Sequence, residues 1–203
     1  MSTPMIDRRL FVLGLAALSA CSSDPPPPEV FYRLGALAPV QPLAGGPIRG
    51  IVDVAQVRTQ GVVGGRAILY REGPNQVIAY HYHAWQEPTG VMLQRALAET
   101  LRSAQAFETV ATPEMRLDRN YELMGDLLLF EHVLSGGGAT VTVEMEITLR
   151  RIAGNRQLLA KTYRADEQVA GATVAAAIPG FTKAVDKIAA ALLADIAAMP
   201  KQA

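Results

Sequence analysis

The 203-residue sequence contains one cysteine, Cys21, and only three histidines. A single cysteine excludes an intramolecular disulfide, so the fold has to be stabilised by its hydrophobic core alone. The 19 Lys and Arg residues are balanced by 19 Asp and Glu residues, which leaves no electrostatic footprint for nucleic acid and no basic surface for lipid headgroups. A membrane-spanning run is also missing, because the apolar stretch at 10–17 is far too short to cross a bilayer.

Cys21 stands at the end of a segment with the features of a secretion signal. Arg8 and Arg9 form a positively charged start, the apolar run 10–17 follows, and Leu-Ser-Ala at 18–20 precedes the cysteine. The tetrad resembles a bacterial lipobox at every position, so we expect cleavage before Cys21 and acylation of its thiol and its freed amine. The alternative is an inert, buried thiol behind an ordinary secretion signal, but the residues at the cleavage position favour acylation.

The rest of the chain divides into a tether and one domain. Removing the signal peptide, 1–20, leaves enough residues for a single domain with a proper core. The segment 21–30 contains the lipidated cysteine and four consecutive prolines, which favour an extended polyproline II spacer. The globular domain is predicted to cover 31–200.

Hydrophobic periodicity predicts an α/β domain of α+β-like organisation, with a mixed sheet and two main helices packed against it. Period-two alternation and short apolar runs predict strands at 31–37, 48–57, 67–71, 76–83, 107–111, 120–133, 139–150 and 157–168. Apolar residues spaced by three and four predict helices at 89–104 and 174–199. Pro179 should kink the second helix or mark the start of its regular part.

The clearest strand, 139–150, is predicted to have one buried face and one solvated face. The face toward the core carries Ala139, Val141, Val143, Met145, Ile147 and Leu149. The face toward water carries Thr140, Thr142, Glu144, Glu146, Thr148 and Arg150.

No catalytic constellation can be found in the sequence. The glycine-rich stretches 61–65 and 136–138 do not form a phosphate-binding loop, and a nucleophile elbow of the Gly-x-Ser-x-Gly type is absent. His81 and His83 could form half of a metal site on one strand face, but a third ligand is missing. We therefore expect no metal and no cofactor.

The segment 80–101 (YHYHAWQEPTGVMLQRALAETL) has a distinctive order: a strand that ends in Trp85, then Glu87 and Pro88, then a Leu-rich helix. Three further features agree with it: Phe31-Tyr32-Arg33-Leu34 shortly after the lipobox, Tyr121-Glu122-Leu123 opening a strand that ends in Phe130-Glu131, and an Ala-rich helix ending in Asp195-Ile196-Ala197. On these residues the chain resembles the ABC-type transport auxiliary lipoproteins, the family that includes the PqiC lipoproteins.

The resemblance implies a lipid-anchored adaptor that is not an enzyme. Members look like outer-membrane-anchored partners of mammalian-cell-entry (MCE) domain proteins, which work with an ABC permease and ATPase to move phospholipids or other hydrophobic molecules. We therefore expect these proteins as partners, together with the membrane through the acyl chains, and we also consider a homo-oligomer. Ser22, at a position where inner-membrane retention usually requires Asp, indicates the periplasmic face of the outer membrane.

Two other functions stay open. The first is an envelope lipoprotein that itself binds a hydrophobic ligand or assists the assembly of outer-membrane polymers. Such a protein would need a cavity. The apolar stripes of the two predicted helices, however, have the extent expected for helices that cover one sheet. The second is an envelope enzyme, against which the missing nucleophile, base and metal ligands argue.

The candidate interface consists of Tyr80, His81, Tyr82, His83 and Trp85, because clustered aromatic and polar side chains are typical of interface hot spots. Trp85 has a second interpretation. A tryptophan at a strand-to-helix junction buries a large area and can be a core anchor instead.

Overall fold

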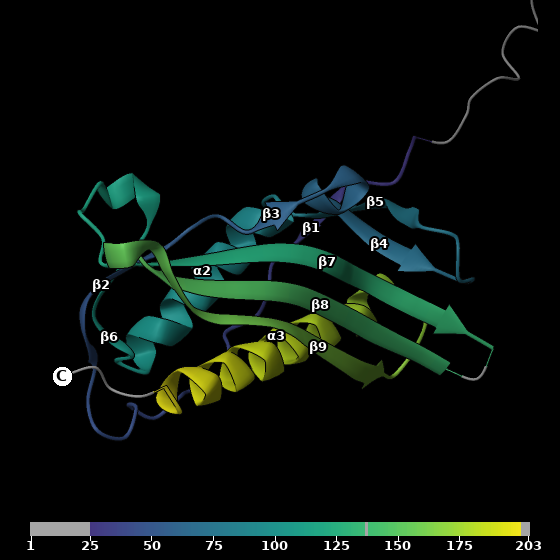
Figure 1. Cartoon of the computed structure of the whole chain (residues 1–203). Helices are drawn as coiled ribbons and strands as arrows, with labels where there is room; N and C mark the ends of the chain where they lie inside the picture. The colour runs from purple at the N-terminus through teal and green to yellow at the C-terminus, as the bar shows by residue number, and fades with distance from the viewer. Residues whose placement is uncertain (1–24, 137, 200–203) are drawn as a thin grey trace, which may run out of the picture.

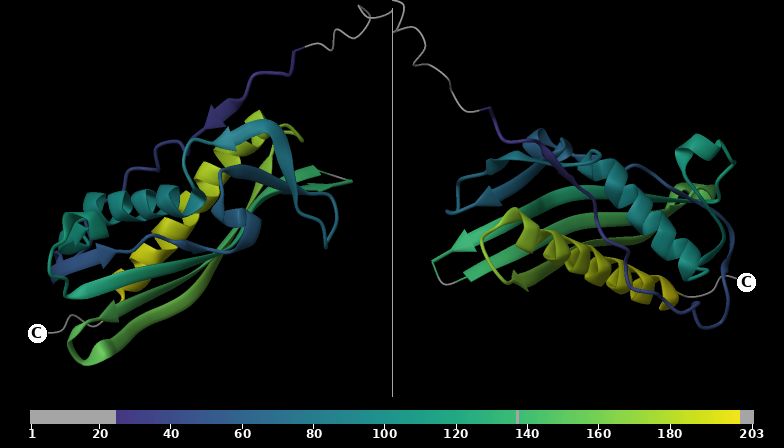
Figure 2. Two further views of the ribbon diagram at one scale, coloured as in Figure 1. Left: turned by 90° about the horizontal axis from the view of Figure 1, so that it is seen from above. Right: turned by 180° about the vertical axis from the view of Figure 1, so that it is seen from behind.

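The computed structural model describes residues 25–136 and 138–199. The predicted signal peptide, Cys21 and the predicted end of the domain at residue 200 lie outside the described residues. A curled mixed sheet carries two main helices, α2 (Thr89–Ser103) and α3 (Val174–Ala197), which pack against the same side of it (Figures 1 and 2). This arrangement confirms the predicted fold class.

The long strand β7 (Tyr121–Ser135) organises the sheet. On one side, β8 (Gly138–Arg151) pairs antiparallel along the length of β7, and β9 (Arg156–Val169) pairs antiparallel with β8. On the other side, three short strands pair in parallel with successive parts of β7: β2 (Ile48–Val54), β3 (Arg58–Thr59) and β4 (Ala67–Arg71). The two ends of β7 therefore belong to different groups of strands.

The remaining strands extend these two groups. At one end, β6 (Phe107–Ala111) pairs in parallel with β2. At the other end, β5 (Ile78–Trp85) forms the predicted antiparallel hairpin with β4, and β1 (Val30–Tyr32) pairs in parallel with β5. Short 3₁₀ turns occupy η2 (Gly61–Gly64), η3 (Pro113–Met115) and η4 (Ala153–Asn155).

Two of the predicted strands are shorter than expected. The strand predicted at 31–37 ends at Tyr32, because the backbone N–H groups of Gly35 and Ala38 donate to side chains of α3, each at 3.0 Å, instead of to a neighbouring strand. The strand predicted at 48–57 is interrupted after Val54, since the N–H of Val57 donates to the carbonyl of Gly90 in α2. Both breaks come from tertiary contacts with a helix.

Helix α3 begins at Val174, where the hydroxyl of Thr173 accepts a hydrogen bond from the N–H of Ala176. Pro179 lies inside the helix, so the prediction that it could mark the start of the regular part was wrong. At the next position, a Cβ on Gly180 would lie 2.5 Å from Val169 Cγ1. Only glycine allows the helix backbone to approach the sheet this closely.

The centre of the core is aromatic. The ring of Trp85 lies 5.5 Å from Phe130 and 5.2 Å from Phe181, and the last two rings are 4.6 Å apart, all between centroids. These residues come from β5, β7 and α3, so the hairpin, the central strand and the C-terminal helix meet in one contact. The predicted core face of β8 is buried around them as expected.

The other face of β8 is less solvated than predicted. Thr142 is only 2 % exposed, and its hydroxyl donates to Asp166 at 2.6 Å. It lies in register between Glu131 of β7 and Asp166 of β9. The prediction that Thr142 faces water was therefore wrong, because the threonine is enclosed between acidic residues of the two neighbouring strands and is hydrogen-bonded to one of them.

Three substitutions in β8 separate these environments in urea-unfolding experiments. Val143→Asp should lower the free energy of unfolding by several kcal/mol, because it buries an unpaired carboxylate in the core. Thr142→Asp should cost about 1–3 kcal/mol, since the new carboxylate removes the donor to Asp166 and faces two like charges. Glu146→Gln, on an exposed side chain, should change it by less than about 0.5 kcal/mol. Equal effects at 142 and 146 would contradict this assignment.

Candidate interaction site

The strand that carries the predicted interface is bulged. In the β4–β5 hairpin Ala67 pairs with Ala84, but Leu69 pairs with Ala79, so β5 contains extra residues between these two pairs. Tyr82 lies in this bulge with a φ of 61°, a left-handed conformation that is unusual for an aromatic residue. The simple alternation predicted for this strand is therefore broken, and the two histidines do not form one ligand pair on a regular strand face.

Trp85 is 0 % exposed and belongs to the aromatic core. Its backbone N–H donates to the carbonyl of Arg66, and its carbonyl accepts from the Arg66 Nε at 2.9 Å. The structure thus places Trp85 in the core as an anchor. Because its side chain is fully buried, it is not an accessible part of the candidate interface. Trp85 is the last residue of β5, its side chain points into the core, and helix α2 begins four residues later.

Tyr80 is half-buried and joins a cluster of rings that the sequence does not reveal. Its hydroxyl shares a hydrogen bond with Nδ1 of His132 at 2.8 Å, and its ring centroid lies 4.4 Å from that of Tyr70. Burial, with smaller contributions from Tyr70 and Glu72, raises the pKa of Tyr80 to about 12. At neutral pH the phenol is consequently a neutral hydrogen-bonding group.

His132 is fully buried beneath Tyr80 and was not predicted as part of any site. Desolvation lowers its pKa, so the neutral imidazole is favoured. Its Nε2 finds no hydrogen-bond partner among the described residues, and the described parts of the chain contain no group of three metal-ligating side chains. The Tyr and His residues of β5 indicated a ring cluster, but the residue spacing does not show that β7, which carries His132, lies next to β4 and two strands from β5.

His81 and Tyr82 are the exposed residues of the predicted interface, and strand β1, which was not predicted to belong to it, pairs with β5 beside them. Val30 pairs with His83 across β1 and β5, and Phe31 pairs with Ala84. The exposed fractions are 40 % for Val30, 51 % for Phe31 and 44 % for Tyr82. We call these residues, Val30, Phe31, His81 and Tyr82, the tether-side surface, because β1 directly follows the proline-rich spacer.

Two contacts hold the tether-side surface in place. The Tyr32 hydroxyl and His83 Nδ1 share a hydrogen bond at 3.1 Å, which fastens β1 to β5. The guanidinium of Arg66 lies 4.9 Å from the centroid of Phe31 in a cation–π contact. An exposed aromatic residue that is already oriented loses little conformational freedom on binding a partner.

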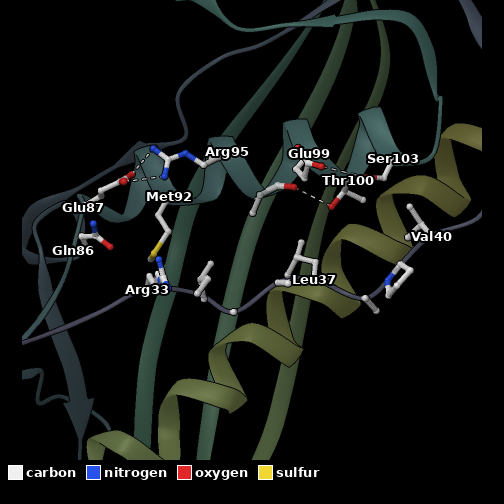
Figure 3. A pocket seen from close by; sticks show the side chains of 16 residues that line it. Arg33, Leu37, Val40, Gln86, Glu87, Met92, Arg95, Glu99, Thr100 and Ser103 are labelled. Carbon is white, nitrogen blue, oxygen red and sulfur yellow. Dashed lines mark hydrogen bonds and ion pairs between the residues drawn. The ribbon is translucent and has the colours of Figure 1, made fainter.

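Hollows also occur in the surface of the described domain. One, of about 450 Å³, lies between the segment 33–40 and α2 (Figure 3). Met92 points from the helix toward Arg33 in this groove, and the charged groups at its rim include the ion pair of Arg95 with Glu87 at 2.8 Å. Another hollow, of about 600 Å³, lies near the end of α3. No helix in the described part of the chain is long and apolar enough to cross a membrane.

The model of one protein family, the ABC-type transport auxiliary lipoprotein component, matches residues 32–196. The chain belongs to the ABC-type transport auxiliary lipoprotein family. The match includes the central strand and both helices, and thus nearly all of the described domain. The resemblance seen in the sequence is confirmed, and the protein is assigned to the lipoprotein components of ABC transport systems.

Solved structures share the fold of this auxiliary lipoprotein. A crystal structure of a Xanthomonas campestris protein is 20 % identical with a TM-score of 0.72, covering 81 % of this chain and 92 % of its own. An uncharacterized protein is 14 % identical with a TM-score of 0.66, covering 84 % and 99 %. A hypothetical protein of Chlamydia trachomatis is 7 % identical with a TM-score of 0.50, covering 74 % and 97 %. No curated protein matches the sequence.

Substitutions at Trp85 and Tyr82 test the separation between the core and the tether-side surface of the auxiliary lipoprotein. Trp85→Ala should lower the free energy of unfolding by about 3–5 kcal/mol, because it empties the space between two other rings. Tyr82→Asn should change it by no more than about 0.5 kcal/mol, since asparagine tolerates a positive φ and the side chain is exposed. Similar melting temperatures for both variants would contradict the assignment of Trp85 to the core.

Proposed function

We propose that this lipoprotein is the lipid-anchored adaptor of an ABC transport system that moves phospholipids or other hydrophobic molecules between the inner and outer membranes. Its partners in this proposal are an MCE-domain protein and the permease and ATPase of the same system. The observation that carries the proposal is the family match over residues 32–196. The adaptor itself performs no chemistry and contributes position and binding.

The tether supports this role. Acylated Cys21 would hold the chain at the periplasmic face of the outer membrane, as Ser22 indicates. The eight residues 22–29 would span roughly 25 Å at about 3.1 Å per residue in polyproline II. Such a spacer leaves room for a protein partner to reach the tether-side surface. We therefore propose that the MCE-domain protein docks there, on Phe31 and Tyr82.

The anchor is tested by the mass and location of the protein. Wild type should carry acyl chains on an N-terminal Cys21 peptide and sediment with the outer membrane. Cys21→Ala should give a soluble or uncleaved product without acyl mass. A wild-type protein whose N-terminal peptide carries no acyl mass would contradict the lipid anchor.

The docking is tested by affinity purification of the wild type from its own cells. The MCE-domain protein, permease and ATPase should be enriched with it. The double variant Phe31→Ser, Tyr82→Asn should lower that enrichment about tenfold at an unchanged melting temperature, because hot-spot aromatics supply much of the binding energy. Glu146→Gln is the matched surface control. Absence of all three proteins from the wild-type sample would contradict the adaptor role, whereas unchanged enrichment with the double variant would contradict only the docking surface.

The second candidate function, direct binding of a hydrophobic ligand, is favoured by one specific observation. The sequence suggested that the two helices cover the sheet without leaving a cavity, but a hollow of about 600 Å³ lies at the end of the domain. This hollow has the volume of a small-molecule site, for which about 300–1,000 Å³ is typical.

A further inference from the structure

The hollow of about 600 Å³, here called the distal cavity, lies where several elements end or begin. The loop before β2, the starts of β6, β7 and β9, and the last turn of α3 surround it. Its apolar wall includes Leu43, Ile48, Phe107, Leu149, Leu158 and Ile196. Three of these, Phe107, Leu149 and Ile196, are buried members of the core. The inner wall of the cavity is therefore continuous with the hydrophobic core at one end of the sheet.

Two arginines line the same cavity, Arg49 and Arg156, and both are exposed. No acidic residue is part of the described lining. Elsewhere arginines are paired: Arg71 binds Glu131 at 2.6 Å, and Arg95 binds Glu87 at 2.8 Å. Within the described residues, Arg49 and Arg156 have no ion pair with a carboxylate. The rim thus has an excess of positive charge above an apolar interior.

We propose that the distal cavity binds a single-chain anionic amphiphile, such as a long-chain fatty acid or an anionic lysophospholipid. The apolar wall would take the acyl chain, and the two arginines would pair with the carboxylate or phosphate at the mouth. A cavity of this volume holds a drug-sized ligand, which suits one acyl chain better than a diacyl lipid. The site therefore recognises the combination of one chain and one negative headgroup.

The position of the cavity separates it from the protein's own anchor. The described tether leaves the domain at one end, and the end of α3, with the starts of β7 and β9, lies at the other (Figures 1 and 2). Acyl chains on Cys21 would be held at the tether end. The distal cavity is consequently available to a lipid that arrives from elsewhere, and this binding goes beyond the adaptor role, which does not require it.

The proposal is tested with photoactivatable lipids on membranes that carry the full-length lipoprotein. The probes are diazirine analogues of palmitic acid, lysophosphatidylglycerol and lysophosphatidylcholine. Light-dependent adducts, mapped by mass spectrometry, should fall on the segments 43–49 and 156–158. The two anionic probes should label severalfold more strongly than the zwitterionic choline probe. Their relative yields show whether a free carboxylate or a phosphate headgroup is the better ligand.

Two variants assign the labelling to the cavity. Arg49→Gln with Arg156→Gln should lower labelling by the anionic probes about tenfold and labelling by the choline probe much less, because the choline cation already neutralises that probe's phosphate. Leu158→Trp, which fills the apolar space, should lower labelling by all three. Tyr82→Asn, at the tether-side surface, should label like wild type, and melting temperatures should show that every variant is folded.

Three outcomes would overturn the proposal. Labelling confined to the tether-side half, or anionic labelling that survives both cavity variants, would exclude this site. Labelling that occurs only after deletion of residues 200–203 would show that this segment, and not a lipid, occupies the cavity in the intact protein. The arginine variant should still enrich the MCE-domain protein. Lipid labelling therefore tests this inference, whereas enrichment of the partner tests the adaptor role, and the failure of one can be told from the failure of the other.

Discussion

The packing of Trp85 against Phe130 and Phe181 is the contact on which the rest of the molecule depends. It joins the β4–β5 hairpin, the central strand β7 and helix α3 in one buried cluster. Strand β1 then pairs with β5 directly beside this cluster. The segment that connects the domain to its proposed lipid anchor is therefore paired with the strand that carries the buried Trp85. A force applied through the tether would act on strand β1, which is hydrogen-bonded to β5.

The two helices and the charge pairs leave only certain surfaces available for binding. One face of the sheet is covered by α2 and α3. On the other face, ion pairs such as those of Arg164 with Glu144 and Asp166, each at 3.0 Å, neutralise the charges on neighbouring strands. Among the surfaces described above, the tether-side surface lies at one end of the domain and the distal cavity at the other. A protein partner and a lipid could consequently be bound without competing for the same residues.

The sequence predicted those elements whose side chains follow a simple period. Strand β6 and helix α2 agree with their predicted bounds to within one residue, because packing reinforces the local pattern. Prediction failed where a distant side chain replaced a local partner. The N–H of Gly35 donates to Thr182, Thr142 is covered by its neighbours, and His132 contacts Tyr80 across 52 residues. Such contacts between distant residues cannot be predicted from the spacing of residues along the chain.

The two interpretations of Trp85 could not be separated by sequence, because a core anchor and an interface residue are both found beside aromatic neighbours at a strand end. The structure assigns Trp85 to the core and leaves Tyr82 at the surface. The proposed docking of an MCE-domain protein on that surface is tested most directly by a photoactivatable phenylalanine placed at position 82 in living cells. We predict a light-dependent adduct with the MCE-domain protein that is absent when the same group replaces Glu146. An equal yield from both positions, or none from position 82, would contradict the claim.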